Sequence, residues 1–229
     1  GTLLANDPHF KLSVPSQFYL AHLDLSGGGI IGGTIPGIPT IVAGRSSYIG
    51  WGISASYADD QDLYAEEVRE SDSSMYRSLN GWKKFRTDET YIKIKGDKSK
   101  KIILKWSENG PILNKKTSQI SDITPEGHEM ALSWTMLSPK DTSISALINL
   151  TYSKDLSTAL KALEKHIAPS LNYTITDNQN IALQLAGRLP IRNANHATKG
   201  RLPSLGYVKE NRWLGYKPYN TNIRIINPN

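Results

Sequence analysis

Short stretches in which apolar and polar residues alternate make up most of this 229-residue sequence, and they favour a fold built largely on β-sheets. Residues 91–95 alternate strictly, a turn signal follows at Gly96-Asp97, and residues 101–106 return as a second strand, which predicts a hairpin. Other β-rich runs are separated by turn-forming residues, and we expect strands over 17–25, 29–35, 40–43, 48–56, 129–137, 172–176 and 181–185.

One segment, residues 153–166, instead has the spacing of a helix. Its apolar residues recur at i, i+3, i+4 and i+7, namely Leu156, Ala159, Leu160 and Leu163. Ser153 or Asp155 can cap the start of this helix, and Pro169 follows its end. No internal repeat or linker is visible. We therefore predict an α+β fold with mostly antiparallel sheets, in a single domain over residues 1–229.

The charge and the residue types exclude several classes of protein. Lys and Arg total 27 against 21 Asp and Glu, a formal net charge of +6. The densest lysines alternate with apolar residues over 92–105 without interleaved aromatic residues, which predicts a solvated strand face and no nucleic-acid partner. The absence of cysteine excludes disulfides, thiolate metal sites and a cysteine nucleophile. No apolar run approaches the ~18 residues of a membrane span, so no membrane association is expected.

Local motifs give few catalytic candidates. The five histidines have no zinc-ligand spacing, and neither a nucleophile elbow nor a phosphate-binding loop is present. The acidic group around residue 60 is the exception: Asp59 and Asp62, with the carbonyl of Gln61, offer oxygen ligands of the kind that calcium binds. Taken alone, the spacing is more typical of a solvated acidic turn, because it does not match an EF-hand loop.

An ordered series of short motifs resembles a known family. The series starts with Leu3-Leu4-Ala5-Asn6-Asp7-Pro8-His9 and continues with Pro36-Gly37-Ile38-Pro39, Gly44-Arg45, Tyr48-Ile49-Gly50-Trp51-Gly52 and Asp62-Leu63-Tyr64-Ala65-Glu66. It goes on through Asn109-Gly110-Pro111-Ile112, Leu171-Asn172-Tyr173, Asp177, Gly187-Arg188-Leu189-Pro190-Ile191-Arg192, Trp213-Leu214-Gly215 and Asn227-Pro228. These pieces resemble the β-subunit of the penicillin acylase (penicillin amidase) family, the self-processing N-terminal-nucleophile amidohydrolases. The resemblance covers nearly the whole chain.

The resemblance implies a four-layer αββα fold with stacked antiparallel sheets, cut by autoproteolysis from a precursor that also supplies an α-subunit. It implies hydrolysis of a small N-acyl amide by an N-terminal Ser whose own α-amino group is the general base. It implies a periplasmic or secreted enzyme without an organic cofactor. By this resemblance the chain is the central part of the β-subunit. The nucleophile is expected upstream of Gly1 and an oxyanion-hole Asn beyond Asn229, so the 229-residue chain itself is predicted to be inactive.

The family's site residues can be placed only where the motifs match. The backbone N–H of Ala55 is the expected oxyanion donor, and His9 is expected to hold the nucleophile in place. The expected acyl-pocket residues are Phe10, Ala43, Ile53 and Leu171, and the small Ala43 suggests a wide pocket; core packing is the alternative for each. With the resemblance, the calcium interpretation of the acidic group becomes the favoured one, with the ligands Asp59, Gln61, Asp62 and Gly200.

We therefore expect an amidohydrolase acting on a penicillin, a cephalosporin or an acyl-homoserine lactone. The main alternative is a non-catalytic binding or structural homologue that keeps the fold without the nucleophile. A basic nucleic-acid-binding β-domain is the remaining alternative, and it predicts steeply salt-dependent binding to DNA.

Overall fold

The computed structural model describes residues 1–116 and 119–228, and in it the chain divides into two compact units. Unit 1 consists of Gly1–Ala58, Ser138–Leu189 and Lys217–Asn229, and unit 2 consists of Asp59–Leu137 and Pro190–Tyr216. The chain passes from one unit to the other several times, so no single linker marks a boundary in the sequence. The single domain over residues 1–229 stays a prediction.

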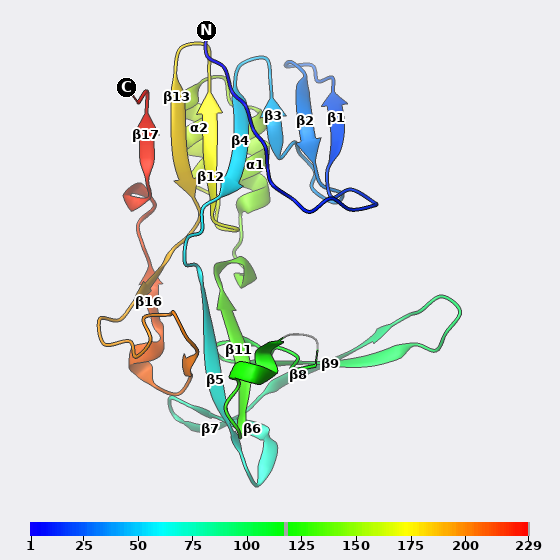
Figure 1. Cartoon of the computed structure of the whole chain (residues 1–229), viewed down its shortest axis with the longest axis vertical. Helices are drawn as coiled ribbons and strands as arrows, with labels where there is room; N and C mark the ends of the chain where they lie inside the picture. Colours follow the sequence, from blue (N-terminus) through cyan, green and yellow to red (C-terminus); the bar gives the residue numbers. More distant parts are fainter. Residues whose placement is uncertain (117–118, 229) are drawn as a thin grey trace. The chain divides into compact units, whose positions relative to one another are not determined.

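The described part of unit 1 is organised around a seven-stranded sheet with the strand order β1-β2-β3-β4-β12-β13-β17 (Figure 1). Every neighbouring pair in it is antiparallel. The strands are β1 (Tyr19–Leu23), β2 (Ile30–Thr34), β3 (Ala43–Arg45), β4 (Gly50–Ala55), β12 (Leu171–Thr176), β13 (Ile181–Ala186) and β17 (Arg224–Ile226). Strands from the first and the last thirds of the sequence thus meet at β4 and β12.

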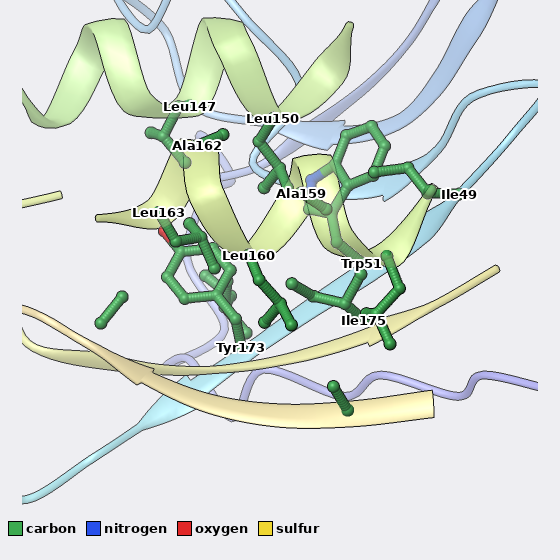
Figure 2. Close-up of a cluster of buried hydrophobic side chains, with 14 of the residues drawn as sticks. Ile49, Trp51, Leu147, Leu150, Ala159, Leu160, Ala162, Leu163, Tyr173 and Ile175 are labelled. Atoms are coloured by element: carbon green, nitrogen blue, oxygen red, sulfur yellow. The ribbon is translucent and has the colours of Figure 1, made fainter. Parts of the chain in front are cut away.

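Two helices, α1 (Ser143–Thr151) and α2 (Leu156–Leu163), pack on one face of this sheet (Figure 2). Trp51 of β4 and its register partner Ile175 of β12 lie on that face and are fully buried. Leu150, Leu160 and Leu163 of the helices pack against them. Because buried apolar area dominates folding free energy, this cluster fixes β4 and β12 against the helices.

The helix expected over 153–166 is confirmed as α2, which is shorter than the periodic segment. Asp155 is its N-cap: the side chain of Asp155 accepts a hydrogen bond from the N–H of Thr158 at 2.7 Å. The preceding helix α1 was not predicted. Its N-cap, Thr142, makes no side-chain cap hydrogen bond, and the β-branched residues Ile144 and Ile148 lower its helix propensity.

Unit 2 contains smaller sheets. In its described part, β11 (His128–Trp134) pairs with β5 (Gln61–Arg69), followed by β6 (Asp72–Ser78) and β7 (Gly81–Lys84), and the short β15 (Ser204–Leu205) runs parallel to β5. A second sheet contains β8 (Arg86–Ile92), β9 (Lys100–Ser107) and β10 (Gly110–Pro111), and a two-stranded sheet joins β14 (Pro190–Arg192) to β16 (Trp213–Tyr216). Short 3-10 helices cover Gln119–Ile123, Thr135–Leu137, Lys209–Asn211 and, in unit 1, Tyr219–Thr221.

The predicted lysine-rich hairpin is confirmed as β8 and β9, which pair from Arg86↔Trp106 to Ile92↔Lys100. Its first strand begins earlier than the alternation suggested, and apolar residues such as Tyr91 and Ile103 are exposed along with the lysines. The α+β class is confirmed by the mixture of antiparallel sheets and few helices. Among the described residues, no helix has the length and apolar character needed to cross a membrane.

Candidate active site

Strand β4 has one edge that is paired along its whole length and one that is not. On one side, β12 pairs with it from Gly50↔Thr176 to Ala55↔Leu171. On the other side, β3 reaches only Trp51, through the pair Gly44↔Trp51. Among the described strands, residues 52–55 therefore have no partner on the β3 side.

The N–H of Ala55 faces this unpaired side. In the turn between β3 and β4, the N–H of Ser46 donates to the carbonyl of Ile49 at 2.8 Å, so the backbone groups of Ile49 face β3. Backbone groups of an antiparallel strand alternate in direction, so the carbonyl of Ile53 and the N–H of Ala55 face the same way. The carbonyl of Ile53 accepts a hydrogen bond from Asn6 Nδ2 there, at 2.8 Å, which agrees with this direction. The carbonyl of Ala55, at the end of the strand, accepts a hydrogen bond from Asn172 Nδ2 of β12 at 3.4 Å.

The N-terminal segment crosses β4 on its way to β1 (Figure 1, dark blue) and is attached at two points. The hydroxyl of Thr2 donates to the carbonyl of Asp177, beyond the far end of β12. The Asp177 side chain accepts hydrogen bonds from the N–H groups of Leu156, Gln179 and Asn180. Partial burial opposes ionisation of Asp177, but these hydrogen bonds hold its pKa below the usual range. The second attachment is the contact between Asn6 and Ile53.

His9 and Phe10 follow this segment. His9 lies on the surface with Nε2 3.7 Å from Asp7 Oδ2. Phe10 is half-exposed and packs against Phe18, with the ring centroids 5.1 Å apart. The structure thus places His9 in an accessible position, and its expected role beside a nucleophile stays a prediction.

The four expected acyl-pocket residues lie in different surroundings. A cavity of about 760 Å³ in unit 1 is lined by Leu4, Phe18, Trp51 and Ala43, and Ala43 alone of the four reaches it. Ile53 is buried in the core cluster, and Leu171 packs against that cluster. With Phe10 beside Phe18, the four do not share this cavity. Their role in binding an acyl chain stays a prediction.

Around Asp62 the structure brings the expected calcium ligands together, but with an arginine among them. The guanidinium of Arg192 donates to Asp62 at 3.0 Å, to Asp59 Oδ1 at 2.9 Å and to the carbonyl of Gln61 at 3.2 Å. The indole N–H of Trp213 donates to the same Asp62 carboxylate. The Asp62 side chain is 1% exposed, so this charge is balanced almost without water.

The charges of this cluster stabilise one another. Partial burial opposes the charge of Arg192, but hydrogen bonds and attraction from Asp62 and Asp59 raise its pKa above the ordinary value. Burial raises the pKa of Asp59, the charge of Arg192 opposes that shift, and Asp62 adds to it. Gly200 lies so close to this cluster that no larger residue would fit: a Cβ on it would lie 2.5 Å from Asp62 Oδ1 and 2.3 Å from Arg192 Nε.

This donor set does not fit calcium as it stands. A calcium ion needs six to eight oxygen ligands, whereas N–H groups already occupy the oxygens of Asp62, Asp59 and Gln61. In the described part of the chain, no group of three or more His, Cys, Asp or Glu is placed to hold a metal ion. Calcium binding therefore stays a prediction, and no functional step is derived from it. The sequence motif contained Arg192 and Trp213, but neither was expected at this site.

A second buried carboxylate, that of Glu66 on β5, was not predicted as a site residue. Its Oε1 accepts hydrogen bonds from Ser107 Oγ and, at 2.8 Å, from Asn109 Nδ2, while Oε2 has no partner among the described residues. Burial raises the pKa of Glu66, although the two hydrogen bonds act in the opposite direction. Glu66 thereby connects β5 to the turn between β9 and β10. Because Asn109 lies far from Glu66 in the sequence, residue spacing could not predict this pair.

The fold has clear relatives among solved structures. A thermostable penicillin G acylase from Alcaligenes faecalis superposes with a TM-score of 0.83 at 23% sequence identity, over 96% of this chain and 38% of that one. This likeness confirms the expected α+β fold class.

Sequence comparison adds the family. The pattern described as penicillin amidase matches residues 1–229. An acyl-homoserine lactone acylase of Pseudomonas aeruginosa is 28% identical over 220 residues, and one of Pseudomonas fluorescens is 30% identical over 217 residues. Both alignments cover 94% of this chain and 26% of the relative. Penicillin G acylase of Escherichia coli is 26% identical over 227 residues, covering 99% of this chain and 26% of that protein. The chain belongs to the penicillin amidase family, and it spans about a quarter of the length of these relatives.

The Arg192 cluster gives a prediction about stability. Arg192→Ala in the full-length protein leaves the Asp62 carboxylate buried without its cation, which should lower the free energy of unfolding by about 3 kcal/mol in urea titrations. The matched control is Arg201→Ala, an exposed arginine in the segment that follows β14, which should change the free energy of unfolding by less than about 0.5 kcal/mol. Equal effects of the two substitutions would contradict the role given to Arg192.

Glu66 gives a prediction about pH. A carboxyl whose pKa is raised by folding stabilises the protein fully below its ordinary pKa of 4.5, and that stabilisation is lost as the pH rises through the higher folded value. Glu66→Gln cannot ionise, so between about pH 5 and about pH 8 its melting temperature should fall less than that of the unmodified protein. Glu67→Gln, at the neighbouring and more exposed position, is the control and should keep the original pH dependence. A pH dependence unchanged by Glu66→Gln would refute the assignment.

Proposed function

We propose that the protein containing this chain is an amidohydrolase that cleaves an N-acyl amide through an N-terminal Ser lying outside these 229 residues. Membership of the penicillin amidase family supports this proposal, as do relatives that are named acylases. The single structural observation that carries it is the N–H of Ala55, which faces the unpaired edge of a rigid, central strand.

This N–H suits an acyl-transfer site for an electrostatic reason. When a nucleophile attacks an amide carbonyl, negative charge develops on the oxygen, and a fixed donor stabilises that charge without having to reorganise. The ladder with β12 and the core under Trp51 hold the strand in place, while Ala55 itself is exposed. In this proposal the carbonyl oxygen of the substrate takes the place on β4 that a neighbouring strand would otherwise occupy.

The proposed nucleophile supplies its own base. The α-amino group of an N-terminal residue has a pKa of ~8, so it is partly neutral at working pH and can accept the hydroxyl proton as the oxygen attacks. His9, exposed at the end of the N-terminal segment, is proposed to hold this nucleophile through its main chain or imidazole. The acyl group would lie near Phe10, Ala43, Ile53 and Leu171, and the small side chain of Ala43 leaves space for a long or bulky acyl chain.

The acyl substrate is proposed to be a penicillin, a cephalosporin or an acyl-homoserine lactone, since two of these compound classes appear in the names of the relatives. Autoproteolytic processing, an α-subunit from the same precursor and a periplasmic or secreted location complete the proposal. N-terminal sequencing of the mature protein tests the processing directly, because it must find a new N-terminal Ser.

Activity on a graded series of substrates tests the function. The full-length mature protein should hydrolyse N-acyl amides, and its kcat/KM should vary with acyl chain length and between penicillin and homoserine lactone leaving groups. If the mature protein with an N-terminal Ser hydrolyses none of these compounds, the non-catalytic homologue becomes the correct interpretation.

The donor role of Ala55 gives a sharper prediction. Ala55→Pro removes the N–H and should lower kcat of the full-length enzyme by about 10²–10³-fold with little change in KM. Ala55→Gly keeps the donor and should stay close to the parent enzyme. The comparison uses variants that mature and keep their melting temperature. Equal kcat values for the two variants would remove Ala55 from the mechanism.

A further inference from the structure

The side chain of Asn6 makes the contact that holds the N-terminal segment against the unpaired edge of β4. Its Nδ2 donates to the carbonyl of Ile53 at 2.8 Å, and no strand pairs with this carbonyl in the described part of the chain. Ile53 lies two residues before Ala55, a distance of about 6–7 Å along a strand. Asn6 thus binds the carbonyl that immediately precedes the N–H of Ala55 along the unpaired edge of β4.

Gly52 provides the space for this contact. A Cβ on Gly52 would lie 2.8 Å from both Cβ and Cγ of Asn6 and 3.0 Å from its Nδ2, closer than such atoms can approach. The backbone of Gly52 is not in the left-handed region, so an L-residue there would meet no conformational strain. What requires glycine at position 52 is therefore the side chain of Asn6.

The same segment also has an attachment that is independent of Asn6. Thr2 donates to the carbonyl of Asp177, next to Thr176, which is the register partner of Gly50 at the opposite end of β4. The segment would thus stay on the sheet if the Asn6 contact were lost, but its position beside Ala55 would change. His9 follows Asn6 by three residues, so the same contact sets where His9 emerges.

We propose that Asn6 is a positioning residue of the amidohydrolase site: its amide, seated against Gly52, sets the distance between the N–H of Ala55 and the segment that carries His9. This inference rests on the proposed function. Asn6 does not touch the reacting atoms. It acts through the distance between the N–H of Ala55, which contacts the substrate, and His9, which holds the nucleophile. A displacement of about 1 Å between such groups costs up to about 10²-fold in rate.

The test uses steady-state kinetics of the full-length mature enzyme on its best N-acyl substrate. Gly52→Ala, Asn6→Ala and Asn6→Asp should each lower kcat by about 10- to 100-fold while KM changes much less, because positioning affects the transition state more than binding. Asn6→Asp is the sharpest of the three, since it keeps the size of the side chain but turns an acceptor toward the Ile53 carbonyl.

Two matched controls separate positioning from general destabilisation. Gly50→Ala alters the same face of the same strand, where the added Cβ would meet Thr176 Cγ2 at 3.3 Å and not Asn6. Thr2→Val removes the other attachment of the segment. Both variants should keep kcat within about twofold. The double variant Asn6→Gly with Gly52→Ala should be no slower than Asn6→Gly alone, because the added methyl group then meets no side chain of residue 6, whose Cβ is also gone.

The outcomes are distinct. An active parent enzyme whose kcat is unaffected by Asn6→Asp and Gly52→Ala would overturn the inference and leave the proposed function in place. The inference would also be overturned if Gly52→Ala slowed the Asn6→Gly enzyme as much as it slows the parent enzyme, or if Thr2→Val slowed the enzyme as much as Asn6→Asp. A mature parent protein without hydrolytic activity would overturn the proposed function, and the positioning role with it.

Discussion

The early end of the ladder between β3 and β4 is the constraint on which the site in unit 1 depends. The pairing of β4 with β3 ends at Trp51, whereas its pairing with β12 continues to Ala55, so the last residues of β4 are paired on one edge and unpaired on the other. Trp51 and Ile53 anchor the strand in the core below, which leaves its backbone little freedom to move. An N–H that is both fixed and free of a strand partner is what stabilisation of an oxyanion requires, and elsewhere in a sheet the ladder would use it.

In unit 2, two buried carboxylates and their hydrogen-bond partners hold strand β5 in place. The buried carboxylate of Asp62 is satisfied by Arg192 and Trp213, two residues that approach from the paired strands β14 and β16. Glu66, four residues later on β5, is held by Asn109 and Ser107. Each carboxylate links β5 to residues distant in sequence. Removing one partner leaves a buried polar group, and the free-energy cost of that group exceeds the net contribution of the pair.

Periodicity predicted the elements whose pattern is local. The capped helix α2, the lysine-rich hairpin and the pair β12–β13 follow from spacing and turn residues alone. Helix α1 was not predicted, and its N-cap, Thr142, makes no side-chain hydrogen bond to the helix. Both compact units are assembled from segments distant in sequence, so no local pattern marks them. The contacts of Arg192 with Asp62 and of Asn6 with Ile53 span more than forty residues of sequence, so only the folded chain could reveal them. The resemblance to the penicillin amidase family supplied the fold class and Ala55, but the open edge beside Ala55 is a property of strand pairing that no motif encodes.

The donor role of Ala55 can be tested by a crystal structure of the full-length mature protein bound to an aryl boronate, whose tetrahedral adduct mimics the transition state of amide hydrolysis. We expect a boronate oxygen about 2.7–3.1 Å from the backbone nitrogen of Ala55, on the side of β4 that Asn6 also approaches. A boronate bound elsewhere, or an N–H of Ala55 hydrogen-bonded to another strand of the mature protein, would contradict it.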